Sequence, residues 1–149
     1  MNNFEYTKDN FLCRKCGICS VKGINPFISG RGNINSNILV LGEAPGKNEN
    51  ELKSPFVGPS GQMLNFYLKE LDIDCYISNA VKGQPIDDKG NNRTPSPSEI
   101  ECCRPFTIEL IRTMKPKVII AVGRIAIVQL IKVNHILELM RGSHIMFLN

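Results

Sequence analysis

Short runs of apolar residues alternate along this chain with stretches in which apolar residues recur every three or four positions. The runs are rich in branched and aromatic side chains, and they predict four strands, at residues 38–41, 75–81, 117–122 and 144–148. The first and third runs are almost wholly aliphatic, as in strands that are buried on both faces. The pattern therefore predicts a buried central sheet whose strands are separated by helices.

The periodic stretches predict three helices. Ser60 can cap the first helix, and Ser96 or Ser98 can cap the second, which runs to about Met114. The third helix covers residues 124–131, directly after Gly123. The expected apolar positions of the first helix are Met63, Leu64, Tyr67, Leu68 and Leu71. Those of the second are Ile100, Cys103, Phe106, Ile108, Leu110 and Ile111. Segments 42–59 and 84–97 are predicted loops.

Strands that alternate with helices in this way are typical of α/β folds with a mostly parallel sheet. We expect a three-layer sandwich with a central, mostly parallel four-stranded sheet, formed as a single domain by residues 1–149. Ligands of such sheets bind at the carboxyl ends of the strands. A site is therefore expected in the loops that follow Leu41, Val81 and Val122.

Composition narrows the class of protein. With 42% hydrophobic residues the chain is expected to be globular, and its net charge of +4 permits an acidic partner such as nucleic acid without requiring one. The first ten residues do not form a signal peptide, and no apolar stretch is long enough to span a bilayer. We expect a cytoplasmic protein, in which the six cysteines are metal ligands or buried thiols rather than disulfides.

Two glycine-containing loops follow the first predicted strand. In the segment 42–46, Gly-Glu-Ala-Pro-Gly, the glycines let the backbone approach a ligand closely. In the segment 55–61, Pro-Phe-Val-Gly-Pro-Ser-Gly, Phe56 can offer its ring to a flat base. The backbone N–H groups of Gly58, Ser60 and Gly61 lie at a helix start, where they can hold a phosphate. The alternative is an ordinary loop with a packed phenylalanine.

Asn79 stands near the end of the second predicted strand. Its side-chain amide has one acceptor and two donor positions, so it can pair with both the carbonyl and the ring N–H of a pyrimidine. The alternative is an asparagine that closes the strand through hydrogen bonds to the backbone.

The cysteines form a candidate metal site. Cys13 and Cys16 have Cys-x-x-Cys spacing, Cys19 follows three residues later, and Cys102 and Cys103 are adjacent. Such spacing is common in zinc sites and in iron–sulfur clusters, and folding could bring four sulfurs together. The alternative is a set of small, buried apolar side chains.

Taken in order, these segments resemble the motifs of the uracil-DNA glycosylase superfamily, most closely its iron–sulfur (family 4-type) branch. The resemblance extends from Cys13 to Arg141 and rests on several ordered blocks: residues 42–46, 55–58, 76–82, 92–95, 103–106, 116–126 and 141–142. It implies a protein that recognises uracil in DNA and hydrolyses its N-glycosidic bond, in base excision repair, after the nucleotide has flipped out of the stack.

The resemblance also implies roles for individual residues. Phe56 would stack on the uracil, and Asn79 would read its edge and reject cytosine, whose donor and acceptor pattern is reversed. Glu43, Ala44 and Pro45 would line the pocket. Glu43 and Glu49 are the candidate catalytic carboxylates, and Glu49 would position a water molecule or stabilise an oxocarbenium-like sugar.

The family's [4Fe–4S] cluster takes four cysteines, of which Cys13, Cys16 and Cys103 match three by position. The other should follow Lys82, where this chain has Gly83, which carries no ligand atom. Either Cys19, Cys75 or Cys102 substitutes, or the cluster has three protein ligands, or no cluster forms. We favour Cys19, because Cys102 is adjacent to Cys103 on a helix and points elsewhere. Zinc is a further alternative.

A second departure concerns the C-terminal part of the pattern. After its Arg-Gly the family continues to a His-Pro segment, whose histidine bonds the leaving uracil, and no such segment precedes Asn149. His135 and His144 are expected to be surface or strand-end residues. The chain is therefore expected to be shortened at this end.

Three alternatives stay open: an active minimal glycosylase, an impaired homologue that binds DNA, uracil or a protein partner, and a fragment of a longer glycosylase. A general phosphate- or nucleotide-binding domain is disfavoured, because residues 42–46 lack both the ending of a phosphate loop and the spacing of a dinucleotide fingerprint.

Overall fold

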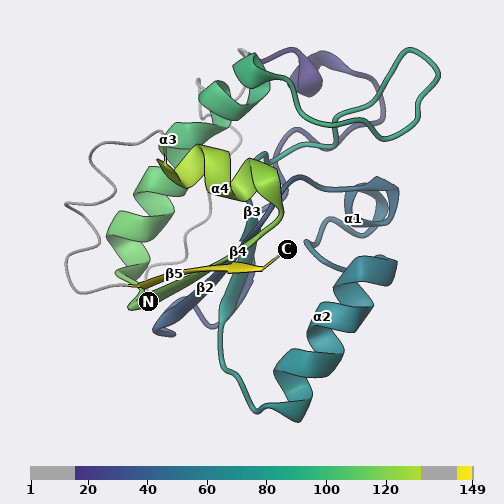
Figure 1. Ribbon diagram of the computed structural model, residues 1–149. Coiled ribbons are helices and arrows are strands. Elements are labelled where there is room, and N and C mark those ends of the chain that lie inside the picture. Colours follow the sequence, from purple (N-terminus) through teal and green to yellow (C-terminus); the bar gives the residue numbers. More distant parts are fainter. Residues whose placement is uncertain (1–15, 132–143, 149) are drawn as a thin grey trace.

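The sheet is the centre of the molecule. The structure is a computed structural model and describes residues 16–131 and 144–148. Its sheet has the strand order β1-β3-β2-β4-β5. Figure 1 labels β2, β3, β4 and β5. Four strands run parallel, namely β2 (Ile38–Gly42), β3 (Tyr76–Asn79), β4 (Val118–Val122) and β5 (His144–Leu148). They confirm the predicted parallel strands, and β1 (Arg31–Gly32) adds a two-residue strand antiparallel to β3.

Helices cover both faces of this sheet. Figure 1 shows α2 (Pro59–Glu70) on one face and α3 (Pro97–Met114) with α4 (Arg124–Ile131) on the other. The predicted three-layer α/β sandwich is thus confirmed. A short 3-10 helix, η1 (Ile18–Ser20), precedes the sheet, and α1 (Lys47–Leu52) lies in the connection between β2 and α2. None of the helices in the described ranges is long and apolar enough to cross a membrane.

Two apolar cores follow from the alternation of side chains along the strands. On one face, side chains of β2 and β4 pack against α3 and α4; this core includes Leu39, Leu41, Leu110, Ile111, Met114, Ile119, Ala121, Ala126 and Leu130. On the other face, Val40 and Ile77 pack with Leu64 and Leu68 of α2. Because β2 is covered on both faces, the loops at its carboxyl end start from a rigid strand.

The start and the buried face of α2 differ from the prediction. Gly58 is the N-cap residue and Pro59 the first helical residue, so Ser60 lies inside the helix and does not cap it. Proline suits that position because its missing N–H would be unpaired there in any case. Of the predicted apolar positions, Leu64 and Leu68 pack inward. Met63, Tyr67 and Leu71 are 67%, 57% and 66% exposed, because they lie off that stripe or, for Leu71, at the helix end.

The start of α3 agrees with the prediction, whereas the helix α1 was not predicted. Ser96 does cap α3: its hydroxyl accepts from the Glu99 N–H, and the Glu99 carboxylate accepts from the Ser96 N–H at 2.7 Å. In contrast, α1 formed where a loop was expected. This six-residue helix buries none of its residues, so it has no apolar periodicity that sequence reasoning could detect.

A buried glutamine ties α4 to the rest of the fold. The Gln129 side chain is fully buried; its Oε1 accepts from Thr107 Oγ1 at 2.7 Å, and its Nε2 donates to the carbonyl of Ala80 at 2.9 Å and to that of Ile100 at 3.3 Å. Thus one side chain joins α4, α3 and the segment that follows β3. Buried polar groups lose free energy when such partners are removed.

We expect Gln129→Met to lower the free energy of unfolding by about 1–3 kcal/mol, because it leaves the Thr107 hydroxyl and the Ala80 carbonyl without this partner. Urea denaturation followed by circular dichroism measures the change. The exposed Gln62→Met on α2 is the matched control and should stay within about 0.5 kcal/mol of the native chain. Equal effects of the two substitutions would contradict the role given to Gln129.

Candidate functional site

A cavity of about 360 Å³ opens at the carboxyl ends of β2, β3 and β4. It lies where the sequence placed a site, and its lining includes most of the predicted site residues: Glu43, Ala44, Glu49, Phe56, Gly58, Ser60, Gly61 and Asn79. Pro45, also predicted, is buried in the same loop and does not line the cavity. A single cavity thus joins segments that lie far apart along the chain.

Four lining residues were not predicted as site residues: Gly46, Pro59, Asn92 and Val122. Asn92 comes from the long loop before α3, where its Oδ1 accepts from Gln84 Nε2 at 2.5 Å. Residues 92–95 belong to the motif blocks of the sequence, and this is the signal that could have identified Asn92 as a site residue. Val122 ends β4, and that position alone marked it as a neighbour of the site.

The ring of Phe56 meets the amide of Asn79 above Gly42. A Cβ atom built on Gly42 would overlap the Phe56 ring and would lie 2.5 Å from Asn79 Oδ1. Glycine at position 42 is therefore required by two side chains at once. A flat face and a hydrogen-bonding edge consequently border the same part of the cavity.

The backbone of Phe56 has an unusual conformation. Its φ is +56°, in the left-handed region that bulky side chains rarely adopt. A Cβ atom on Gly61 would overlap the backbone of Phe56, so the first turn of α2 presses directly against this residue. The conformation that aims the ring into the cavity is thus enforced by its surroundings.

Glu49 is one of the groups that enforce it. Its Oε1 accepts from the N–H groups of Val57 at 2.9 Å and Gly58 at 2.7 Å, and its Oε2 accepts from the N–H of Gly46 at 3.1 Å. The carboxylate therefore bridges the loop after β2 and the loop that carries Phe56. Hydrogen bonds to a charged acceptor are stronger than those between neutral groups.

Asn79 presents its side chain to the cavity. The residue is 4% exposed, and in the described ranges no hydrogen bond is made by its side-chain amide. Its backbone is fixed: the carbonyl accepts from Lys82 Nζ at 2.7 Å, and the following N–H, of Ala80, donates to the Gly42 carbonyl at 2.8 Å. A rigidly held amide that bonds none of the described residues is suited to pair with a ligand.

Glu43 is the second carboxylate of the cavity. Burial raises the pKa of its carboxyl, and the positive charge of Arg124 partly opposes this effect. A Cβ atom on Gly123 would lie 4.0 Å from Glu43 Oε2, which places the carboxylate beside the turn between β4 and α4. Among the described residues no hydrogen bond to this carboxylate is formed, so its oxygens are available to a ligand or to water.

Two of the candidate cysteines lie in one apolar cluster. Cys16 and the buried Cys103 pack in one apolar cluster with Ile18, Val81 and Phe106, and Cys103 Sγ accepts from the N–H of Lys82 at 3.4 Å. Cys13 lies outside the described residues, as does the side chain of Cys19. In the described ranges, no three His, Cys, Asp or Glu side chains gather as a metal site.

The space that a side chain at position 83 would need is occupied by a methyl group of Ile18. A Cβ atom on Gly83 would lie 2.6 Å from Ile18 Cγ2, and the backbone oxygens of Asn25 and Pro26 are at 3.3 and 3.4 Å from it. Ile18 is 4% exposed. The residues around Gly83 therefore do not fit a cluster held by a fourth ligand at that position.

We expect Glu49→Gln to lower the free energy of unfolding by about 1–3 kcal/mol, because the amide replaces one acceptor oxygen with a donor that faces N–H groups. Denaturant titration measures the change. Glu51→Gln on the exposed side of α1 is the matched control and should have little effect. A stable Glu49→Gln protein would show that the three backbone bonds contribute little.

Comparisons with known proteins agree with this geometry. The family model of the uracil DNA glycosylase superfamily matches residues 29–148. The type-4 uracil-DNA glycosylase of Pyrobaculum aerophilum is 39% identical over 119 residues, which are 77% of this chain and 59% of that protein. The type-4 uracil-DNA glycosylase of Archaeoglobus fulgidus is 36% identical over 125 residues, or 82% of this chain and 60% of that protein.

The lengths of these proteins differ from that of this chain, which spans about three fifths of the first two relatives. A segment of the DNA polymerase of Bacillus phage SP01 is 30% identical over 129 residues, which are 83% of this chain but 13% of the polymerase. Residues 29–148, which the family model matches, include the residues that line the cavity and all the strands of the parallel sheet. This chain belongs to the uracil-DNA glycosylase superfamily.

Proposed function

We propose that the cavity binds a uracil flipped out of DNA and that the protein hydrolyses its N-glycosidic bond. The observation that carries the proposal is the meeting, over Gly42, of the Phe56 ring with the Asn79 amide, which makes no hydrogen bond to another described residue. The names of the relatives from Pyrobaculum aerophilum and Archaeoglobus fulgidus support it. The protein would act on DNA in the cytoplasm.

The Phe56 ring and the Asn79 amide would have different roles in binding a base. The Phe56 ring offers a flat apolar face, on which any base can stack. The Asn79 amide supplies selectivity, because its acceptor and donors match a uracil carbonyl and ring N–H but oppose the reversed pattern of cytosine. A volume of about 360 Å³ lies within the usual range for small-molecule pockets.

The start of α2 is our candidate for contact with the DNA backbone. Helix N-termini attract phosphate, and α2 is twelve residues long. The N–H of Gly58 already donates to Glu49, and Pro59 has no N–H. The phosphate contact is therefore assigned to the N–H groups of Ser60 and Gly61, together with the exposed hydroxyl of Ser60.

Two carboxylates of the cavity are candidates for the chemistry. As the bond to the base breaks, positive charge develops on the sugar, and a nearby carboxylate and a positioned water molecule stabilise and trap it. The Glu43 carboxylate has no hydrogen bond within the described residues and is our candidate for this role. Glu49 as the water-positioning residue stays a prediction, and its three backbone bonds favour Glu43.

A second candidate function is binding without efficient catalysis, to DNA or to a protein. Exposed apolar side chains on α2 favour a protein partner, since Met63, Phe66 and Tyr67 are each more than half exposed. A segment of the much longer DNA polymerase of phage SP01 is similar to this chain. This similarity supports a role in which the domain works next to other protein domains.

For a cofactor, we infer that any cluster in this chain is held by Cys13, Cys16 and Cys103 with a fourth ligand other than residue 83, for which Cys19 is our candidate. No catalytic step proposed above depends on the cluster. Cys16 and Cys103 support the inference because they pack in one apolar cluster, next to the segment that carries Cys19.

Iron analysis of anaerobically purified protein tests the ligand set. We expect Cys19→Ala to lower the iron content and Gly83→Cys to leave it unchanged, because Ile18 fills the space at position 83. Added to Cys19→Ala, the pair Gly83→Cys/Ile18→Ala opens that space and supplies a new fourth ligand, so it should restore the iron content that Cys19→Ala removes. Zinc in place of iron, or iron unaffected by Cys19→Ala, would contradict this assignment.

Uracil recognition is tested with a single-stranded oligonucleotide that contains one uracil. We expect abasic sites to form, and Asn79→Ala to reduce the rate on the order of a hundredfold, because two hydrogen bonds to the base are lost. Asn35→Ala, in an exposed turn far along the chain from the site, is the matched control.

The outcomes separate the candidates. Cleavage that survives Asn79→Ala would show that another group reads the base. Selective binding of the uracil-containing strand without cleavage supports the binding module. A folded protein that neither cleaves nor binds the strand would refute both catalysis and DNA binding, and a protein partner would then be the remaining candidate.

A further inference from the structure

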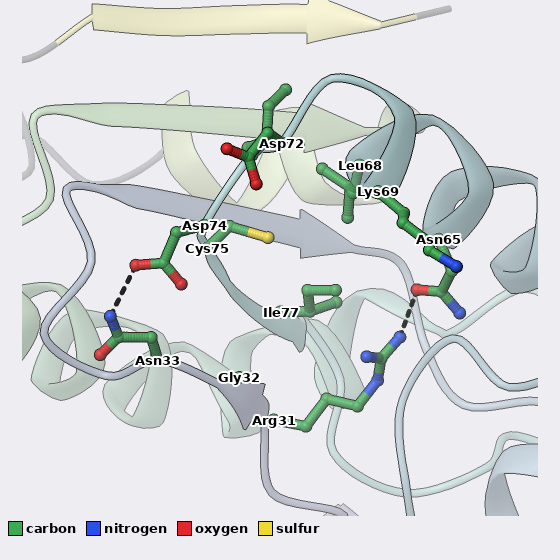
Figure 2. Close-up of a pocket in the computed structure, with 11 residues that line it drawn as sticks. Arg31, Gly32, Asn33, Asn65, Leu68, Lys69, Asp72, Asp74, Cys75 and Ile77 are labelled. Carbon is green, nitrogen blue, oxygen red and sulfur yellow. Dashed lines mark hydrogen bonds between the residues drawn. The ribbon is translucent and has the colours of Figure 1, made fainter.

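A second cavity, of about 460 Å³, lies beside the edge of the sheet where β1 pairs with β3. Figure 2 shows Arg31 and Asn65 on its wall, with their side chains pointing toward one another. Neither residue lines the cavity that contains Asn79. Both, however, reach the back of the loop that carries Phe56.

The contacts of Arg31 are directed at two successive carbonyl groups. Its Nε donates to the Pro55 carbonyl at 2.8 Å, and its Nη2 donates to the Phe56 carbonyl at 3.4 Å and to Asn65 Oδ1 at 2.5 Å. Asn65 Nδ2 donates to the same Phe56 carbonyl at 3.0 Å. The cation and the amide therefore hold the loop by its oxygens.

The Glu49 carboxylate binds the opposite side of the loop that carries Phe56. Glu49 accepts from the N–H groups of Val57 and Gly58, immediately after Phe56. Carbonyl oxygens thus face Arg31 and N–H groups face Glu49, so each charge matches the polarity of the peptide groups it meets. Between them lies the residue with φ of +56°, a conformation that persists only where the surroundings fix it.

The pairing of β1 with β3 positions Arg31 behind the loop that carries Phe56. Arg31 stands between Gly30 and Gly32 and pairs with Ile77 of β3. A Cβ atom on Gly30 would lie 2.7 Å from the Ile77 carbonyl oxygen, and one on Gly32 would overlap the Cys75 carbonyl. Because the two glycines let β1 lie against β3, the arginine side chain starts from a fixed backbone.

We propose that Arg31, with Asn65, is a positioning residue for Phe56: it holds the base-stacking ring in place through the Pro55 and Phe56 carbonyls and does not touch the DNA itself. The inference rests on the proposed role of Phe56 and adds to it a residue outside the cavity. It also assigns a role to the edge strand, which no motif of the sequence had suggested.

Arg31→Met tests the proposal, because methionine keeps an apolar stem and removes every donor. Lys69→Met is the matched control, since Lys69 is an exposed cation on the same cavity wall. Hydrogen–deuterium exchange of the native chain and both variants is compared over residues 54–61. We expect exchange there to be at least tenfold faster in Arg31→Met, while exchange in the strands of the sheet stays unchanged. In Lys69→Met, exchange over residues 54–61 should equal that of the native chain.

Binding separates positioning from general stability. We expect Arg31→Met to raise the Kd for a uracil-containing single strand about tenfold and to leave the Kd for the same strand without uracil unchanged. Arg31→Lys should restore part of the loss, because lysine can still reach one carbonyl. In the background of Phe56→Ala, Arg31→Met should have no further effect on the Kd, since both act through one ring.

The proposal is wrong if exchange over residues 54–61 is unchanged in Arg31→Met, or if both strands lose affinity equally. It is also wrong if the effects of Arg31→Met and Phe56→Ala add. Should the native chain fail to prefer the uracil strand, the proposed function fails, and the exchange experiment alone decides whether Arg31 holds the loop. Asn65→Ala provides the same exchange test if Arg31→Met does not fold.

Discussion

The site depends on one strained residue that is held from both sides. Phe56 adopts a left-handed backbone conformation, with its following N–H groups bound to Glu49 and its carbonyl bound to Arg31 and Asn65. Such a conformation is unfavourable in isolation, so the free energy that maintains it comes from these bonds and from contact with the first turn of α2. The ring lies over Gly42, where a Cβ atom would overlap it.

The parallel sheet supplies the other half of the geometry. Adjacent strands β2 and β3 end together, and the N–H groups of Ala80 and Val81 donate to the carbonyls of Gly42 and Glu43 at 2.8 and 2.9 Å. The loop with Glu43 and the amide of Asn79 are consequently fixed to one another by backbone bonds alone. A loop shaped by charged side chains therefore meets an edge shaped by the sheet, and the pocket needs both.

Much of this could be predicted from the sequence, and the remainder has a physical reason. Local signals identified the strands and the lining residues Phe56 and Asn79, and they narrowed the cap of α3 to Ser96 or Ser98. Apolar runs and motif blocks are read directly from neighbouring residues. Contacts between distant residues were not predictable in this way. Arg31 lies 24 residues before the Pro55 carbonyl it binds, and Glu49 lies in a helix with no buried side chain. The exposure of Met63 and Tyr67 depends on how α2 docks, which its periodicity does not specify.

The shortness of β1 also bears on association between chains. It forms the border of the sheet beside β3 and contributes two residues, of which one is a glycine and the other an arginine whose side chain is bound to the loop behind it. A long, flat border strand would expose a row of unpaired N–H and carbonyl groups to which another polypeptide could add. Among the described residues, this border of the sheet is too short to template such pairing, so Arg31 also belongs to a strand that offers a second polypeptide little backbone to pair with.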